Sequence, residues 1–158
     1  KVLACKKNIS EPDKIMEEYG IDKLSSDYDE IVAAADIISL HLPANKNTHH
    51  FLDKARLLQL KPGAVFINTA RGSLVDENAL YDALVSGRLS GAGLDVFENE
   101  PYHPLNPDKD LRHLSKVVLT PHIGSSTVEC CKRMAERVIQ NIRFALEKNY
   151  EKMDIVTE

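Results

Sequence analysis

The chain has 158 residues, of which 43% are hydrophobic and 28% are charged, and its formal net charge at pH 7 is −4. This composition is typical of a globular domain and excludes an intrinsically disordered chain, which has too few apolar residues to offset the entropy of ordering. No stretch approaches the ~20 apolar residues of a membrane-spanning helix. The first residues lack the layout of a signal peptide. Because no long basic run is present, we expect no nucleic acid partner and no membrane partner.

The chain contains three cysteines, Cys5, Cys130 and Cys131. An odd count with two adjacent members predicts no disulfide framework, and the cysteines form no CxxC pair of the kind that binds metals. We therefore expect reduced thiols, a cytoplasmic location and no metal site.

Short apolar runs alternate with helical patterns along most of the chain. The expected strands are Val2–Cys5, Ile37–Leu40, Ala64–Ile67, Ala92–Val96 and Val117–Leu119. The expected helices lie near Glu11–Tyr19, Tyr28–Ala35, Asp53–Leu60 and Asp76–Val85, with Asp53 and Asp76 at the positions of N-caps. The strands are apolar at successive positions, which is typical of strands buried on both faces of a parallel sheet. Repeated strand–helix units predict an α/β fold with right-handed crossovers.

A long amphipathic helix is expected after the last strand. The segment from Ser126 to Glu129 fits a capping box. Apolar residues then recur every three or four positions on one face, at Val128, Cys131, Ala135, Val138, Ile142 and Ala145. Because Cys131 lies on this face, we expect it to be packed rather than reactive.

Three chemically useful side chains follow successive strands. Arg71 follows the third expected strand, Glu100 the fourth and His122 the fifth, and in open α/β sheets ligands bind beyond the carboxyl ends of the strands. An arginine fork binds a carboxylate, and a histidine can exchange a proton with a carbonyl or hydroxyl oxygen. Hydride would have to come from a nicotinamide. Each residue alone is equally well explained as a solvated side chain or a helix cap. The irregular segment Glu98–Ser115 is long enough to be functional.

Three segments resemble signatures of the D-isomer-specific 2-hydroxyacid dehydrogenase family. They are Phe66–Glu77, Gly93–Pro101 and Leu119–Gly124, and with Leu40–Pro43 and Thr48 the resemblance spans about Val2 to Leu146. It implies a partial Rossmann-like, doubly wound parallel sheet, NAD or NADP as cofactor, a small 2-hydroxy or 2-oxo acid as substrate, and a homodimer.

The resemblance also implies roles for individual residues. Arg71 matches the arginine that binds the substrate carboxylate, His122 the acid/base, and Glu100 the carboxylate that favours the protonated histidine. Asp95 matches the residue that holds the nicotinamide carboxamide. The matching cofactor-lining positions are Lys6, Leu42, Pro43, Thr48, Thr69, Ala70, Arg71, Asp95, His122, Gly124 and Ser125. The remaining four histidines outside the motifs are expected to be structural or solvated: His49, His50, His103 and His113.

Two departures from the family pattern are visible. The Gly-rich phosphate loop, GxGxxG, is absent from these 158 residues, and so is the first strand that precedes it. We therefore expect residues 1–149 to be the C-terminal portion of an NAD(P)-binding domain, and residues 150–158 to be a tail leading toward a substrate domain. In addition, Lys6 and Lys7 stand where an acidic residue commonly binds the adenosine ribose, which favours NADPH as a hypothesis.

Two other functions fit the same residues. One is an NAD(H)-sensing binding protein similar to the corepressor branch of the family, which keeps the same three site residues. The other is an inactive truncated fragment that acts through an interface. The leading prediction is an oxidoreductase that interconverts a D-2-hydroxy acid and a 2-oxo acid.

Overall fold

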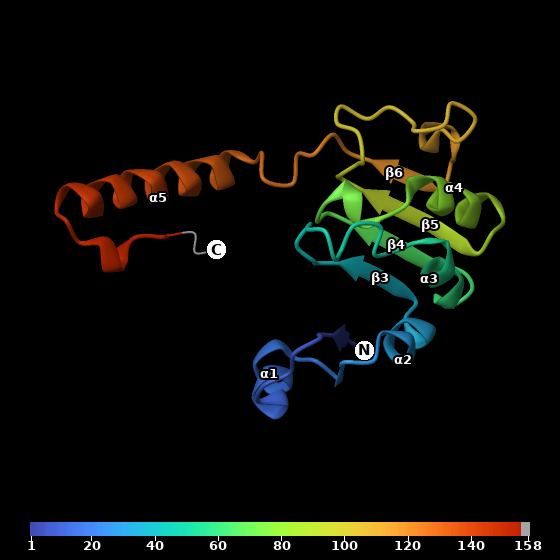
Figure 1. Ribbon diagram of the computed structural model, residues 1–158, viewed down its shortest axis with the longest axis horizontal. Helices are drawn as coiled ribbons and strands as arrows, with labels where there is room; N and C mark the ends of the chain where they lie inside the picture. Colours follow the sequence, from blue (N-terminus) through green and yellow to red (C-terminus); the bar gives the residue numbers. More distant parts are fainter. Residues whose placement is uncertain (156–158) are drawn as a thin grey trace. The chain divides into compact units, whose positions relative to one another are not determined.

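The computed structural model describes residues 1–155 and separates them into two units, one formed by residues 1–121 and one that begins at His122 (Figure 1). The first unit alternates strands and helices, which confirms the predicted α/β class. Its helices are α1 (Pro12–Tyr19), α2 (Tyr28–Ala34), α3 (Lys54–Gln59) and α4 (Glu77–Val85), with short 3-10 turns η1 (Gly72–Leu74) and η2 (Leu111–His113). Its strands are β1 (Leu3–Cys5), β2 (Lys23–Ser25), β3 (Ile37–Leu40), β4 (Ala64–Asn68), β5 (Leu89–Leu94) and β6 (Val117–Leu119).

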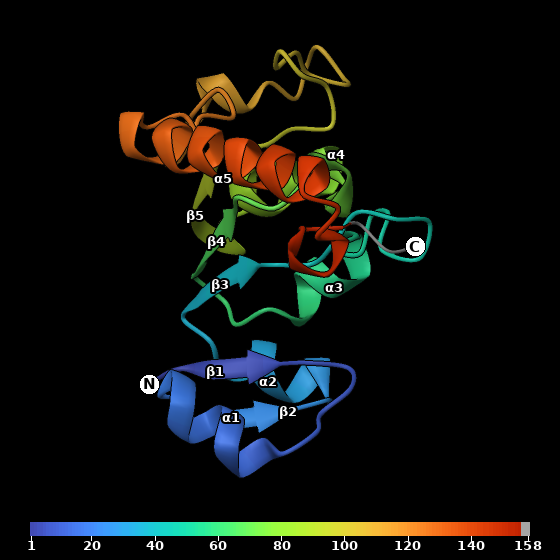
Figure 2. The ribbon, with the colours of Figure 1, turned by 90° about the vertical axis from the view of Figure 1, so that its left-hand side faces the viewer.

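The strands form two parallel sheets, which are both visible in Figure 2. One sheet pairs β1 with β2, and the other has the order β3-β4-β5-β6. In the larger sheet one register row joins Leu40, Asn68, Leu94 and Leu119. Because all four strands run in the same direction, the residues that follow this row meet at one edge, where ligands bind in parallel α/β sheets.

The hydrophobic core covers one face of the larger sheet. Phe66 of β4 is fully buried in the same apolar cluster as Leu57 of α3 and Leu80 of α4. On the two edge strands of this sheet, Ile37 of β3 is 63% exposed and Val118 of β6 is 68% exposed. The expectation that the strands are buried on both faces is therefore wrong for these two positions, because α3 and α4 both contribute to the core on the opposite face.

Two strands differ from the sequence prediction by more than one residue. The strand β2 was not predicted, because its three residues include a lysine and a serine and form no apolar run. The strand β5 begins at Leu89 and ends at Leu94, whereas Ala92–Val96 was expected. Its first half contains Ser90 and Gly91, which are not typical of strands. The apolar pattern therefore predicted a strand that begins only at Ala92.

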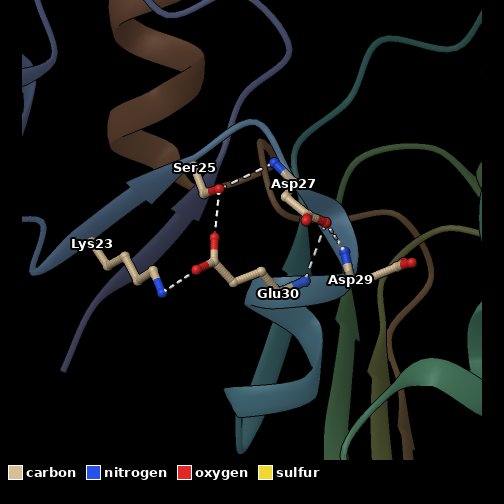
Figure 3. Close-up of polar contacts among 5 residues, drawn as sticks. All are labelled: Lys23, Ser25, Asp27, Asp29 and Glu30. Atoms are coloured by element: carbon tan, nitrogen blue, oxygen red, sulfur yellow. Dashed lines mark hydrogen bonds and ion pairs between the residues drawn. The ribbon is translucent and has the colours of Figure 1, made fainter.

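Aspartate caps start three helices of the first unit. The predicted caps are confirmed, since Asp53 accepts a hydrogen bond from the backbone of Arg56 and Asp76 accepts one from Ala79. Asp27 caps α2 in the same way (Figure 3). Beside it, Glu30 accepts hydrogen bonds from Lys23 at 2.5 Å and from Ser25 at 2.7 Å. These bonds tie β2 to α2, and the bond from Lys23 is the main cause that lowers the pKa of the Glu30 carboxyl.

The second unit consists of α5 (Val128–Leu146) and η3 (Tyr150–Lys152). The helix begins one residue later than expected, because the hydroxyl of Thr127, and not that of Ser126, accepts a hydrogen bond from the backbone of Cys130. Val128 and Cys131 are exposed, so the prediction of a packed Cys131 is wrong. An ion pair between Arg137 and Asp154 holds the segment after η3 against the helix and lowers the pKa of the Asp154 carboxyl.

Within the described residues, no helix is both long enough and apolar enough to cross a membrane. Of the predicted tail, residues 150–155 are described and residues 156–158 lie outside the described part. The expected domain boundary between residues 149 and 150 stays a prediction.

Candidate active site

A buried asparagine shapes the turn that follows β4. Asn68 is only 1% exposed, and its side-chain Nδ2 donates to the carbonyl oxygen of Arg71 at 2.9 Å. Its Oδ1 accepts from the backbone N–H of Ala70 at 3.0 Å. One amide therefore satisfies a donor and an acceptor of the turn from Thr69 to Arg71, which fixes the backbone of three predicted site residues. The sequence prediction did not single out Asn68, although it lies inside the motif.

The side chain of Arg71 is exposed at the end of this turn. Its Nη1 donates to the carbonyl oxygen of Ala70 at 2.6 Å. The next residue, Gly72, is buried against the backbone that follows β5, because a Cβ at Gly72 would lie 1.9 Å from the carbonyl carbon of Phe97. The loops after β4 and β5 are thus in direct backbone contact, and only glycine fits at the crossing point.

A buried carboxylate lies at the ends of β5 and β6. Asp95 is buried, and its Oδ1 accepts a hydrogen bond from the Thr120 hydroxyl at 2.5 Å. The backbone N–H of Asp95 donates to the carbonyl oxygen of Asn68, and the N–H of Thr120 donates to that of Leu94. Asp95 is therefore held in place from both neighbouring strands.

Glu100 lies in the irregular segment after β5. Its side chain is exposed, and Oε1 accepts from the backbone N–H of Phe97 at 3.1 Å. The segment is anchored further along by Lys109, which pairs with Asp82 of α4 at 2.7 Å, and by Tyr102, whose hydroxyl accepts from the N–H of Leu111. The long loop predicted for Glu98–Ser115 is thus present, with η2 as its one 3-10 turn among the described residues.

The loop after β3 carries the next predicted site residues. The hydroxyl of Thr48 donates to the carbonyl oxygen of Pro43 at 2.7 Å and accepts from the N–H of Asn45 at 2.9 Å, so one side chain closes the loop. Leu42 packs against the core. Lys6 is exposed after β1, and its backbone N–H donates to Ser25.

The remaining predicted residues belong to the second unit, which begins at His122. His122 has a φ of 53°, and the backbone N–H of Ser126 donates to the carbonyl oxygen of Ile123, so Gly124 and Ser125 lie in a tight turn before α5. The structure thus gathers Thr69, Ala70, Arg71 and Asp95 at one edge of the larger sheet. The predicted site residues His122, Gly124 and Ser125 belong to the second unit.

The residues from 1 to 124 match the family model of the D-isomer specific 2-hydroxyacid dehydrogenase, NAD binding domain. The chain belongs to this family. The match covers the three sequence motifs, and it confirms the resemblance and the NAD-binding character predicted from the sequence.

Individual relatives support this assignment. A glyoxylate reductase from Thermococcus litoralis is 44% identical over 145 residues, which are 89% of this chain and 42% of that protein. The crystal structure of D-lactate dehydrogenase from Aquifex aeolicus complexed with NAD and lactic acid has a TM-score of 0.80 and 32% identity, and the match covers 96% of this chain and 47% of that one. An acyclic imino acid reductase in complex with NADPH and D-Arg has a TM-score of 0.75 at 36% identity, over 94% of this chain and 44% of that one. This dehydrogenase-family chain spans less than half the length of these relatives.

The chemistry of two features at the edge of the larger sheet would suit the nicotinamide end of NAD. A buried carboxylate at Asp95 is an acceptor suited to a carboxamide N–H, and the turn from Thr69 to Arg71 is held rigidly beside it by Asn68. A Gly-rich loop for the diphosphate is not found in the 158 residues.

Proposed function

We propose that the protein is an oxidoreductase that interconverts a D-2-hydroxy acid and a 2-oxo acid with a nicotinamide cofactor. The observation that carries this proposal is the edge of the larger sheet, where Asn68 pairs in register with Leu94. The turn held by Asn68 leads from the end of β4 to Arg71, and the buried Asp95 directly follows the end of β5. An exposed guanidinium and a buried carboxylate at one edge suit an anionic substrate and a cofactor carboxamide, respectively. The similar proteins of known activity are reductases and dehydrogenases, which favours an enzyme over a nucleotide-sensing binding protein.

Arg71 is assigned to the substrate. A guanidinium offers five N–H donors in a planar fork, and Nη1 of Arg71 bonds the neighbouring carbonyl oxygen of Ala70. Two parallel donors of this fork match the two oxygens of a carboxylate, so Arg71 binds and orients the acid group that all 2-oxo acids share.

His122 is assigned as the acid/base. An imidazole titrates near neutral pH, so it can give a proton to the carbonyl oxygen of a 2-oxo acid and take one back from a hydroxyl. Glu100 is assigned as the carboxylate that favours the protonated imidazole. Both assignments rest on the family motifs, in which these residues occupy the matching positions.

Asp95, Thr69 and Ala70 are assigned to the nicotinamide end of the cofactor, and Leu42, Pro43, Thr48, Gly124 and Ser125 to the surrounding lining. When bound, the nicotinamide supplies the hydride that no side chain can supply. The chain's own contribution is to hold the cofactor's carboxamide at Asp95, whose position is fixed by Thr120.

Lys6 is assigned to cofactor choice. It is exposed at the carboxyl end of β1, where a cation suits the 2′-phosphate of NADPH. The comparison of Michaelis constants for NADH and NADPH tests this assignment. A lower constant for NADPH, which rises when Lys6→Asp is made, supports it, and a strong preference for NADH in the unmodified protein contradicts it.

We further propose that the protein acts in the cytoplasm as a homodimer and binds no nucleic acid. The free thiols of Cys5, Cys130 and Cys131 suit a reducing compartment, and the net charge of −4 disfavours a polyanionic partner. Residues 1–149 are assigned to the cofactor domain and residues 150–158 to a tail toward a substrate domain.

The activity is tested with the protein purified in its native form. Initial rates of NADH and NADPH oxidation are measured with glyoxylate, hydroxypyruvate, pyruvate and 3-phosphohydroxypyruvate. The proposal predicts turnover of at least one of them. If no compound gives a rate above background while the cofactor still binds, the protein is a nucleotide-binding protein and not a dehydrogenase.

A further inference from the structure

Two adjacent histidines and a glutamate form a cluster outside the proposed active site. One ligand atom from each of His49, His50 and Glu98 lies within 4.8 Å of the others. The two imidazole rings are stacked, with centroids 4.0 Å apart and planes inclined by 28°. The sequence predicted structural or solvated roles for both histidines. Glu98 lies 48 residues away from His50 in the chain, so the approach of the two side chains is not visible in the sequence.

The backbone holds His50 toward Glu98. His50 has a φ of 47°, in the left-handed region that non-glycine residues seldom occupy, and its backbone N–H donates to the carbonyl oxygen of Ser73 at 2.8 Å. In this conformation its Nε2 lies 2.9 Å from Oε2 of Glu98. A backbone held in this region commonly marks a functional position, because the surrounding structure must offset its cost.

The carboxylate of Glu98 is itself oriented by a second layer of hydrogen bonds. Its Oε1 accepts from the backbone N–H of Glu77 at 3.2 Å, and the backbone N–H of Glu98 donates to Oε1 of Glu77 at 2.6 Å. The Glu98 side chain is only 13% exposed, so its orientation is fixed. Such supporting hydrogen bonds are typical of carboxylates that bind metal ions.

We propose that His49, His50 and Glu98 bind one divalent transition-metal ion of the Zn²⁺ class. Two imidazole nitrogens and one carboxylate oxygen suit Zn²⁺, whereas Mg²⁺ and Ca²⁺ prefer oxygen ligands alone. Zn–N and Zn–O bonds of about 2.0–2.2 Å in a tetrahedron separate two ligand atoms by about 3.4 Å. The 2.9 Å pair of His50 and Glu98 therefore has to open by only a few tenths of an ångström, and the ion displaces the proton between them.

The exposure of His49 gives the ion a way in. His49 is exposed, so its ring can turn to complete the site, and water fills the fourth position. A bound ion would join the loop after β3 to the loop after β5. The site uses none of the residues assigned to substrate or cofactor, so its test is independent of the proposed activity.

The test is calorimetric titration of the full chain with Zn²⁺, with Mg²⁺ as the comparison ion. A variant in which Cys130 and Cys131 are both replaced by Ser serves as the background, because thiolates also bind Zn²⁺. We expect saturable binding of one Zn²⁺ per chain, with an affinity at least tenfold lower in His49→Gln and in Glu98→Gln. His103→Gln, which removes a histidine outside the cluster, is expected to bind as the background does.

His49→Gln decides the outcome even if Glu98→Gln fails to fold, because His49 is exposed and its loss does not disturb the core. The absorption spectrum of the Co²⁺ complex provides a second readout, since a nitrogen and oxygen site lacks the charge-transfer band of a thiolate ligand. Unchanged Zn²⁺ affinity in His49→Gln, or no saturable binding in the background variant, overturns the proposal.

Discussion

The hydroxyl of Thr120 donates a hydrogen bond of 2.5 Å to Oδ1 of Asp95, and this bond joins the ends of β5 and β6. Asp95 is buried, and a buried carboxylate is costly unless hydrogen bonds compensate for the water that it has lost. The bond therefore both stabilises the sheet edge and fixes the carboxylate that we assign to the cofactor carboxamide.

Replacing Thr120 with Val removes the hydroxyl and keeps the shape. We expect Thr120→Val to lower the free energy of unfolding by about 1–3 kcal/mol, because the Asp95 carboxylate loses one of its donors. Thr120→Ser keeps the donor and serves as the control. Urea denaturation measures both variants, and equal stability of the two would show that the hydroxyl contributes nothing.

The contact between the loops after β4 and β5 is tested at Gly72. A Cβ at this position would lie 1.9 Å from the carbonyl carbon of Phe97, so Gly72→Ala must displace backbone. We expect a loss of about 1–3 kcal/mol in the free energy of unfolding. Gly93→Ala in β5 is the matched control, since no atom lies within 4 Å of its added Cβ. A Gly72→Ala variant as stable as Gly93→Ala would refute the close approach.

The acid sensitivity of the loop after β5 is predicted from Asp110. Hydrogen bonds from Arg112 lower the pKa of the buried Asp110 carboxyl to about 2. A group whose folded pKa is lowered contributes stability above its unfolded pKa of about 3.9 and loses it as the pH falls toward the folded value. Because the Arg112 side chain is 57% exposed, solvent screening reduces the contribution of the Asp110–Arg112 pair to the free energy of unfolding to about 1–2 kcal/mol.

Asp110→Asn is therefore expected to destabilise the protein by about 1–2 kcal/mol at pH 7, and the difference from the unmodified protein should shrink between about pH 4 and pH 2. Thermal or urea unfolding as a function of pH measures it. Asp108→Asn, at an exposed neighbour, is the control. If the stability difference between Asp110→Asn and the unmodified protein stays constant across the pH range, the ion pair with Arg112 is not the cause of that difference.

The substrate role of Arg71 is tested by a change that keeps its charge. Lysine cannot form two parallel hydrogen bonds to a carboxylate, so Arg71→Lys should lower kcat/KM for the 2-oxo acid by at least about tenfold. Arg133→Lys, at an exposed position of α5, should leave kcat/KM unchanged. An Arg71→Lys protein with the original kcat/KM would remove Arg71 from the substrate site.

Much of the fold could be predicted because it depends on local pattern. The apolar runs of β3 and β4 and the caps Asp53 and Asp76 are local signals, and each lies where the sequence indicates. The motif around Arg71 identified the family for a similar reason, since its residues are contiguous.

The errors arise where distant residues decide the structure. The exposure of Cys131 depends on what covers a helix face, and periodicity indicates only that the face is apolar. The contact of Gly72 with Phe97 and that of His50 with Glu98 join segments far apart in the chain, so neither is visible in a sequence pattern. The role of Asn68 could have been inferred, because an asparagine at the end of a strand commonly organises the turn that follows.

The central claim is the acid/base role of His122, and steady-state kinetics of His122→Ala tests it most directly. The protein purified in its native form is compared with His122→Ala and with His113→Ala, which replaces an exposed histidine of η2. We predict that His122→Ala lowers kcat by about 10²- to 10⁴-fold with little change in the Kd for the cofactor, and that His113→Ala retains normal turnover. Normal turnover in His122→Ala would contradict the proposed mechanism.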